Sequence, residues 1–169
     1  LIIHLDEKWF SKYYYKDFTD IKPNEIQIDK FIHKIIDQTE SNFDIVITTG
    51  FKKTIIDDYF IKNYSKKSEN IYEKKINNKK VMYIADTTFN QIENIIKNSS
   101  LLICCEGAVS HVSHFFNVKT IALYESKRLE HIQYWTGHME DCHLYERMPM
   151  NHLLNDNNFF YKIKKIIGI

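Results

Sequence analysis

The stretch LLICCEGAVSH at residues 101–111 holds a fully apolar run that stops at an acid and a glycine. An apolar run this short is typical of a strand buried on both faces. Apolar residues then recur at helical spacing, at Val109, Val112, Phe115 and Phe116. The stretch therefore predicts a strand-to-helix turn between Glu106 and His111. In open α/β sheets such turns lie at the carboxyl edge, where ligands bind and helix N-termini offer free amide donors.

Other apolar runs, on both sides of this stretch, predict further strands at residues 1–5, 43–48, 80–85 and 119–124. Helices are expected from near Pro23, over 55–64, from Asp86 or Thr88, and over 152–167. The first has an apolar face of Ile28, Phe31, Ile32, Ile35 and Ile36, and Thr88 with Gln91 fits a capping box. Because strand and helix alternate, we expect an α/β fold: a Rossmann-like parallel sheet with helices on both faces.

Residues 66–80, rich in Lys, Asn and Glu, are interpreted as a solvated surface excursion.

The composition is that of a folded domain with little net charge. Of 169 residues, 44% are hydrophobic and 14% aromatic, which is enough for a core, and no linker divides residues 1–169. The 23 Lys and Arg nearly balance the 22 Asp and Glu, so we expect no nucleic-acid partner. Cys104 and Cys105 are neighbours on the buried strand, and a reduced, cytoplasmic setting is expected. The chain begins within a strand, so we expect it to be the later part of a longer protein.

The common phosphate-binding signatures are missing from the sequence. Neither GxGxxG nor GxxxxGK[ST] is found, which argues against the usual dinucleotide fold and against phosphate-loop NTPases. Three segments instead resemble the donor-binding half of family 9 glycosyltransferases, the ADP-heptose:lipopolysaccharide heptosyltransferases and their relatives. These segments are residues 87–98, 101–111 and 116–124.

The resemblance depends on the spacing of short motifs. The family's T-S-L helix start is matched by Thr87, Thr88 and Phe89. In its D-[ST]-G-x-x-H turn, Glu106 takes the place of the aspartate, Gly107 that of the small hydroxyl residue, Ala108 that of the glycine and His111 that of the histidine. A lysine beside a tryptophan follows the family's first strand, and Lys8-Trp9 is similar.

The resemblance implies a role for each matched residue in binding a nucleotide-diphosphate sugar. Lys8 and the backbone amides of Gly107, Ala108 and Val109 would stabilise the departing diphosphate, and Thr87 and Thr88 would belong to the donor site. The two side chains assigned to the reaction are Glu106, which would hold sugar hydroxyls, and His111, which would donate to a phosphate or sugar oxygen.

The resemblance also implies the setting of the reaction. The chain would be the carboxyl-terminal half of a two-domain GT-B enzyme catalysing inverting, metal-independent transfer, with no cofactor because the nucleotide sugar is a substrate. An amino-terminal domain outside this chain would bind the acceptor, a lipopolysaccharide core or other surface glycan, and would supply the base. The whole enzyme would work at the cytoplasmic face of the inner membrane, peripheral to it through that domain. This chain alone would bind donor without turnover.

Three other interpretations remain open. Glu125-Ser126-Lys127 replaces the family's G-P-T loop, so a non-catalytic nucleotide- or nucleotide-sugar-binding module is the alternative. Phe51-Lys52-Lys53 lacks the acid expected after the second strand, so the resemblance does not assign a heptose donor. His111 and His114 with Glu106 would instead suggest a metal-dependent hydrolase. Glu106 is also a good partner for a helix dipole, without any function. A second loose cluster fits no zinc spacing and is interpreted as loop residues: His131, His138, Cys142 and His143.

Overall fold

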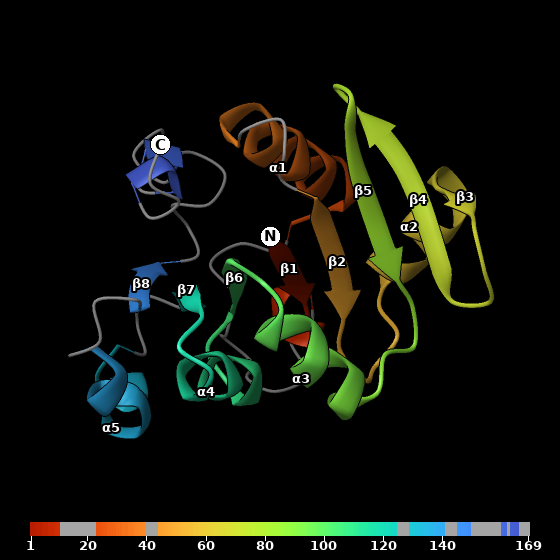
Figure 1. Cartoon of the computed structure of the whole chain (residues 1–169). Coiled ribbons are helices and arrows are strands. Elements are labelled where there is room, and N and C mark those ends of the chain that lie inside the picture. Colours follow the sequence, from red (N-terminus) through yellow and green to blue (C-terminus); the bar gives the residue numbers. More distant parts are fainter. Residues whose placement is uncertain are drawn as a thin grey trace.

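The computed structural model describes residues 1–10, 23–39, 44–124, 129–140, 145–149, 160, 161 and 163–165 (Figure 1). Its elements in chain order are β1 (Ile2–Leu5), the 3-10 helix η1 (Glu7–Trp9), α1 (Glu25–Gln38), β2 (Ile45–Thr49), α2 (Ile55–Asn63), β3 (Ser65–Lys66), β4 (Ile71–Ile76), β5 (Lys79–Ile84), α3 (Phe89–Lys97), β6 (Leu101–Cys105), α4 (Ala108–Phe115), β7 (Lys119–Tyr124), α5 (Leu129–Glu140) and β8 (Tyr145–Pro149). None of the helices in these ranges is long and apolar enough to cross a membrane.

The strands form one sheet in the order β3-β4-β5-β2-β1-β6-β7-β8. Every neighbouring pair from β5 to β8 is parallel. Taken by their own sequence order, these six strands run 3-2-1-4-5-6, which is the order of the doubly wound sheets of the Rossmann fold. The order reverses between β1 and β6, and in such sheets this reversal opens a crevice at the carboxyl edge.

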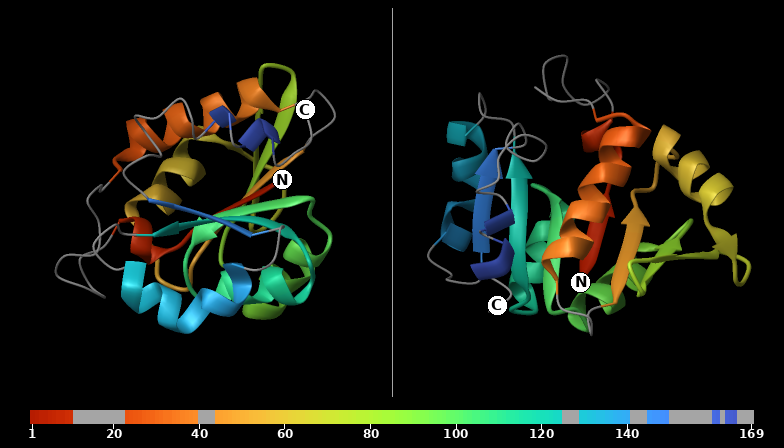
Figure 2. Two further views of the ribbon diagram at one scale, coloured as in Figure 1. Left: turned by 90° about the vertical axis from the view of Figure 1, so that its left-hand side faces the viewer. Right: turned by 90° about the horizontal axis from the view of Figure 1, so that it is seen from above.

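Helices cover both faces of the sheet, as the sequence predicts. In Figure 2, α1 and α2 lie on one face and α3, α4 and α5 on the other. The two faces have separate cores, and the neighbouring cysteines of β6 show the alternation of a strand. Cys105 packs in the core under α1 and α2, whereas Cys104 packs in the core under α3 and α4. Their opposite facing confirms that β6 is buried on both sides.

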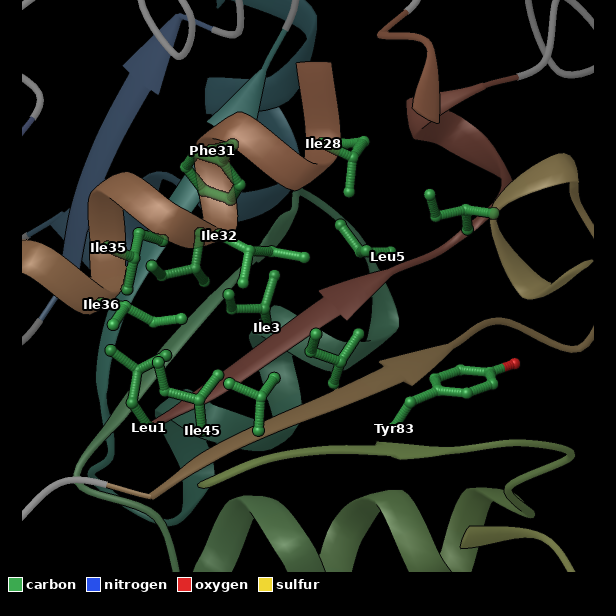
Figure 3. Packing of buried hydrophobic residues seen from close by; sticks show 14 of the residues in the cluster. Leu1, Ile3, Leu5, Ile28, Phe31, Ile32, Ile35, Ile36, Ile45 and Tyr83 are labelled. Atoms are coloured by element: carbon green, nitrogen blue, oxygen red, sulfur yellow. The ribbon is translucent and has the colours of Figure 1, made fainter. Parts of the chain in front are cut away.

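The largest core lies between α1 and the central strands. Figure 3 shows the apolar face of α1 directed onto β1 and β2. All five residues expected on this face are at most 1% exposed: Ile28, Phe31, Ile32, Ile35 and Ile36. The helix begins after Asn24, whose side chain and that of Gln27 form a reciprocal capping box. This pattern confirms the helix expected from near Pro23.

Residues 66–80, interpreted as a solvated surface excursion, are mostly exposed, but the sequence did not predict the strand that they contain. This segment contains β4, which pairs antiparallel with β5 from Ile71↔Ile84 to Ile76↔Lys79, so the sheet is mixed rather than wholly parallel. The connecting Asn77 and Asn78 have φ of 48° and 65°, the left-handed values of a two-residue hairpin turn. The run Glu73-Lys74-Lys75 obscured this strand in the sequence, because the apolar residues Ile71, Tyr72 and Ile76 of β4 do not alternate regularly with it.

The sequence predicted too little structure at the carboxyl end. Neither α5 nor β8 was expected, although β8 pairs with β7 along its whole length, from Thr120↔Tyr145 to Tyr124↔Pro149. Of the helix expected over 152–167, the described residues 160, 161 and 163–165 are helical. The other residues of that range, and Glu125-Ser126-Lys127, lie outside the described part of the chain.

Lys79 caps the carboxyl end of α1 and gives a first prediction. Its buried ammonium donates hydrogen bonds to the carbonyls of Ile36 and Thr39 and, at 2.8 Å, to Thr39 Oγ1. Lys79→Met should therefore lower the free energy of unfolding by about 1–3 kcal/mol, because buried carbonyls lose their donor. Lys80→Met is the matched control: among the described residues the exposed Lys80 side chain pairs with the half-buried Glu73, and the loss of this pair should cost less than about 0.5 kcal/mol. Equal urea midpoints for both variants would contradict the capping role.

Candidate functional site

A crevice lies at the carboxyl edge of the sheet, where the strand order reverses between β1 and β6. It has a volume of about 220 Å³ and is lined by the end of β1, by η1 and its cap residue, by the loop after β2 and by the first turns of α3 and α4. The lining residues are His4, Asp6, Glu7, Lys8, Gly50, Phe51, Phe89, Ile92, Ala108 and Val109. Glu7 also borders an adjoining hollow of about 730 Å³ on the β2 side. Together the two hollows have the size of small-molecule sites.

Lys8 brings a positive charge to the wall of the crevice. It lies in η1, which begins after Asp6 because the Asp6 carboxylate accepts the Lys8 backbone N–H at 3.1 Å. The Lys8 ammonium donates to the Glu106 carbonyl at 3.0 Å and pairs with Asp6 at 3.1 Å. Burial is the largest single effect and lowers the pKa of Lys8, but Asp6 together with the neighbouring Cys105 and Cys104 outweighs it, and the pKa is raised. The ammonium is therefore charged at neutral pH and keeps one N–H beyond these two contacts.

Gly107 lets Lys8 come this close to the start of α4. Its φ is +157° with ψ at −160°, a conformation that is essentially restricted to glycine. A Cβ at this position would also collide with Nζ of Lys8. This contact explains why glycine precedes alanine here, the reverse of the order in the family that the sequence resembles. The glycine is required one position earlier, under the lysine.

The first turn of α4 faces the crevice with free donors. The Gly107 N–H is taken by Ser110 Oγ at 3.2 Å. Within the described residues, the backbone N–H groups of Ala108 and Val109 donate no hydrogen bond. Both residues line the crevice. Free amides at a helix N-terminus beside a half-buried lysine form a positive site that suits an anion.

The Glu106 carboxylate turns away from the crevice. Its Oε1 accepts Arg147 Nε at 2.6 Å, and its Oε2 accepts Tyr145 OH at 2.6 Å and Ser110 Oγ at 3.3 Å. The side chains of Glu106 and Arg147 are 5% and 6% exposed. Burial and the Glu106 carboxylate raise the pKa of Tyr145, which keeps its hydroxyl as the donor. Holding sugar hydroxyls therefore remains a prediction for Glu106, and in this structure the acid ties β6 to β8.

His111 lies outside the crevice, on the side of α4 that faces α5. Its ring stacks on His138 at 5.9 Å between centroids, and His114 meets the same ring edge-on at 5.7 Å. Burial and His138 lower the pKa of His111, which favours the neutral ring at pH 7. The interpretation of His131 and His138 as loop residues is wrong, because both belong to α5. The other two members of that cluster, Cys142 and His143, fall outside the described ranges.

The hydrolase alternative needs a metal site, and the side-chain positions do not support one. The Glu106 carboxylate accepts hydrogen bonds from Tyr145 and Arg147 of β8. Across the described ranges, no three His, Cys, Asp or Glu side chains gather closely enough to hold a metal ion.

Thr87 and Thr88 follow β5 and do not line the crevice. Thr87 is buried, with its hydroxyl 3.5 Å from the Thr49 carbonyl. Thr88 forms the expected capping box with Gln91 at the start of α3. The structure thus gathers Lys8, Gly107, Ala108 and Val109 at one site and gives the two threonines structural contacts.

Sequence reasoning missed His4, which lies in the floor of the crevice at 2% exposure. It is a lone polar residue in the otherwise apolar strand LIIHL, and this was the available signal. Trp9 is fully buried and donates from Nε1 to the His4 carbonyl at 3.1 Å.

Comparison of the chain with family models, with curated proteins and with solved structures gives no match in any of the three.

His4 should make stability depend on pH. Burial, followed by the Lys8 ammonium, lowers the pKa of His4 from 6.5 to about 4, against a smaller opposing effect of Glu7. Since the unfolded chain then binds the proton more tightly, stability is complete above pH 6.5 and falls as the pH drops toward 4. The loss should reach about 3 kcal/mol, at 1.36 kcal/mol per pH unit. The measurement is urea denaturation at pH 7 and at pH 4.5.

His4→Gln is the control, since it removes the titrating imidazole and keeps all the Asp and Glu carboxylates. Burial raises the pKa of the nearby Asp6, whose contribution has the opposite sign and is present in both proteins. The difference in stability between the two proteins should therefore shrink as the pH falls from 6.5 toward 4. A constant difference would contradict a neutral buried His4.

Proposed function

We propose that this chain is the donor-binding domain of an inverting, metal-independent glycosyltransferase with GT-B architecture. It binds a nucleotide-diphosphate sugar in the crevice between β1 and β6. The sugar passes to a lipopolysaccharide or other surface glycan bound by an amino-terminal domain outside this chain, at the cytoplasmic face of the inner membrane.

The observation that carries this proposal is the position of the Lys8 ammonium, beside the free amides of α4 at the reversal of strand order. When the glycosyl bond of a nucleotide sugar breaks, negative charge grows on the departing diphosphate. A fixed cation and fixed amide dipoles stabilise that charge without reorganisation. The resemblance around Lys8-Trp9 and residues 101–111 supports sugar transfer over other chemistry of diphosphates.

Calorimetric titration of the 169-residue chain with ADP, GDP, UDP, CMP and their sugar conjugates tests the proposal. We expect one nucleoside diphosphate to bind selectively. Lys8→Met should weaken it roughly 10- to 100-fold, because a charge-assisted hydrogen bond is lost. Lys62→Met, which removes an exposed lysine of α2, should leave the affinity unchanged. No binding by the folded chain at millimolar ligand would contradict the proposal for this domain.

A second pair of variants separates binding from folding. Ala108→Glu puts a carboxylate in the first turn of α4, where it suits the helix dipole but repels a phosphate. Ala108→Gln has nearly the same shape without the charge. We expect the glutamate variant to fold at least as stably as the glutamine variant and to bind nucleoside diphosphate far more weakly. Equal affinities would argue that the anion does not lie at α4.

One observation favours a second candidate, a nucleotide-sugar-binding module without transferase activity. The Glu106 carboxylate, which the resemblance assigns to the sugar, is already bonded to Tyr145 and Arg147. A transfer assay on the protein with its amino-terminal domain separates the two candidates. Donor binding without transfer to the matching acceptor would favour the module, and turnover would exclude it.

A further inference from the structure

His4 places an imidazole in the floor of the crevice beside Lys8. The residue is on β1, in register with Thr48 of β2, and its Nδ1 lies 2.9 Å from Thr48 Oγ1. Within the described part of the chain, Nε2 of His4 makes no hydrogen bond. The His4 side chain, which is 2% exposed, thus lines the crevice and has one ring nitrogen without a hydrogen bond among the described residues.

The hydrogen bond to Thr48 determines which ring nitrogen carries the proton. Thr48 is fully buried, and its hydroxyl has His4 Nδ1 as its hydrogen-bond partner among the described residues. If Nδ1 carried the proton, the buried hydroxyl hydrogen would lack an acceptor, and such a donor is costly to leave unpaired. Thr48 therefore donates to Nδ1, which leaves the proton of the neutral ring on Nε2.

The ring is a neutral donor rather than a second cation. Burial and the Lys8 ammonium keep its pKa near 4, so it stays uncharged at neutral pH. An N–H group near a lysine ammonium matches a ligand with several anionic oxygens, because each donor takes a different oxygen.

We infer that His4 is a ligand-contacting residue, whose Nε2–H donates a hydrogen bond to a diphosphate oxygen held by Lys8 and the amides of α4. This inference rests on the proposed function, since it assumes that a diphosphate occupies the crevice. It adds to the site a donor that the sequence motifs do not include.

Nuclear magnetic resonance on the chain labelled with ¹⁵N-histidine tests the assignment in the unaltered protein. Long-range proton–nitrogen spectra identify the tautomer of each imidazole. We expect His4 to carry its proton on Nε2. Addition of inorganic pyrophosphate should change the chemical shift of that nitrogen, and the titration curve should give the same dissociation constant as calorimetry. A proton on Nδ1, or an Nε2 signal unmoved by saturating pyrophosphate, would overturn the inference.

Variants of His4 give an independent measurement. In His4→Gln the amide nitrogen takes a position close to Nε2, whereas His4→Leu has no donor. We expect pyrophosphate affinity to fall roughly tenfold or more in His4→Leu and to stay within about threefold of wild type in His4→Gln. His33→Leu, a change on α1 away from the crevice, should bind as wild type.

The outcomes separate this inference from the proposed function. If pyrophosphate and nucleoside diphosphates all fail to bind the folded wild-type chain, the proposed function and the role of His4 are both overturned. If binding depends on Lys8 but His4→Leu binds as well as wild type, only the role of His4 is overturned.

Discussion

Glu106→Ala should be among the most destabilising single substitutions in this chain, lowering the free energy of unfolding by about 3–5 kcal/mol. Glu106 Oε1 and Arg147 Nε are 2.6 Å apart, and both side chains are almost wholly buried. Removing the acid takes away the carboxylate to which the buried Arg147 Nε and the Tyr145 hydroxyl both donate. Chemical denaturation with urea measures the loss.

A double-mutant cycle separates the ion pair from a general loss of packing. Arg147→Ala removes the buried cation, so Glu106→Ala combined with it should cost clearly less than the two single changes added together. Glu69→Ala, an exposed acid in the loop before β4, should stay within about 0.5 kcal/mol of wild type. If Glu106→Ala unfolds at the wild-type midpoint and loses only affinity for the sugar, Glu106 has the ligand role that the resemblance implies.

Trp9→Ala should also cost about 3–5 kcal/mol, the usual range for truncating a buried aromatic side chain. The indole is 0% exposed, its ring centroid lies 6.0 Å from that of Phe31, and its Nε1 bonds the buried carbonyl of His4. Because Trp9 immediately follows Lys8 in η1, its loss should also loosen the lysine and weaken nucleoside diphosphate binding. Urea denaturation and calorimetry measure the two effects.

Two control variants test the role of Trp9: one keeps its packing without the hydrogen bond, and the other removes an exposed tryptophan elsewhere. Trp9→Phe keeps most of the packing but leaves the His4 carbonyl without its donor, and should cost about 1–3 kcal/mol. Trp135→Ala removes a tryptophan that is 61% exposed on α5 and should change stability by less than about 0.5 kcal/mol. Equal stability of Trp9→Ala and Trp135→Ala would show that Trp9 does not anchor η1.

Elements with strong local signals could be predicted from the sequence. The run Leu101–Cys105 gave a strand with the observed bounds, because five apolar residues before an acid and a glycine can be buried on both faces. The helical period of Ile28–Ile36 and the capping pair Thr88 and Gln91 likewise encode α1 and the start of α3. Gly107, Ala108 and Val109 could be chosen from the sequence because strand-to-helix turns lie at the carboxyl edge of an open α/β sheet. Lys8 was chosen only from the resemblance around Lys8-Trp9.

Contacts between residues far apart in the sequence could be seen only in the tertiary structure. Glu106 is bonded to Tyr145 and Arg147, about 40 residues away, on a strand that no local pattern predicted. His4 and Thr48 become neighbours only because β1 pairs with β2 in one register. Local patterns report a period, a cap or a turn, whereas strand pairing and the partner of a buried charge depend on how the whole core packs.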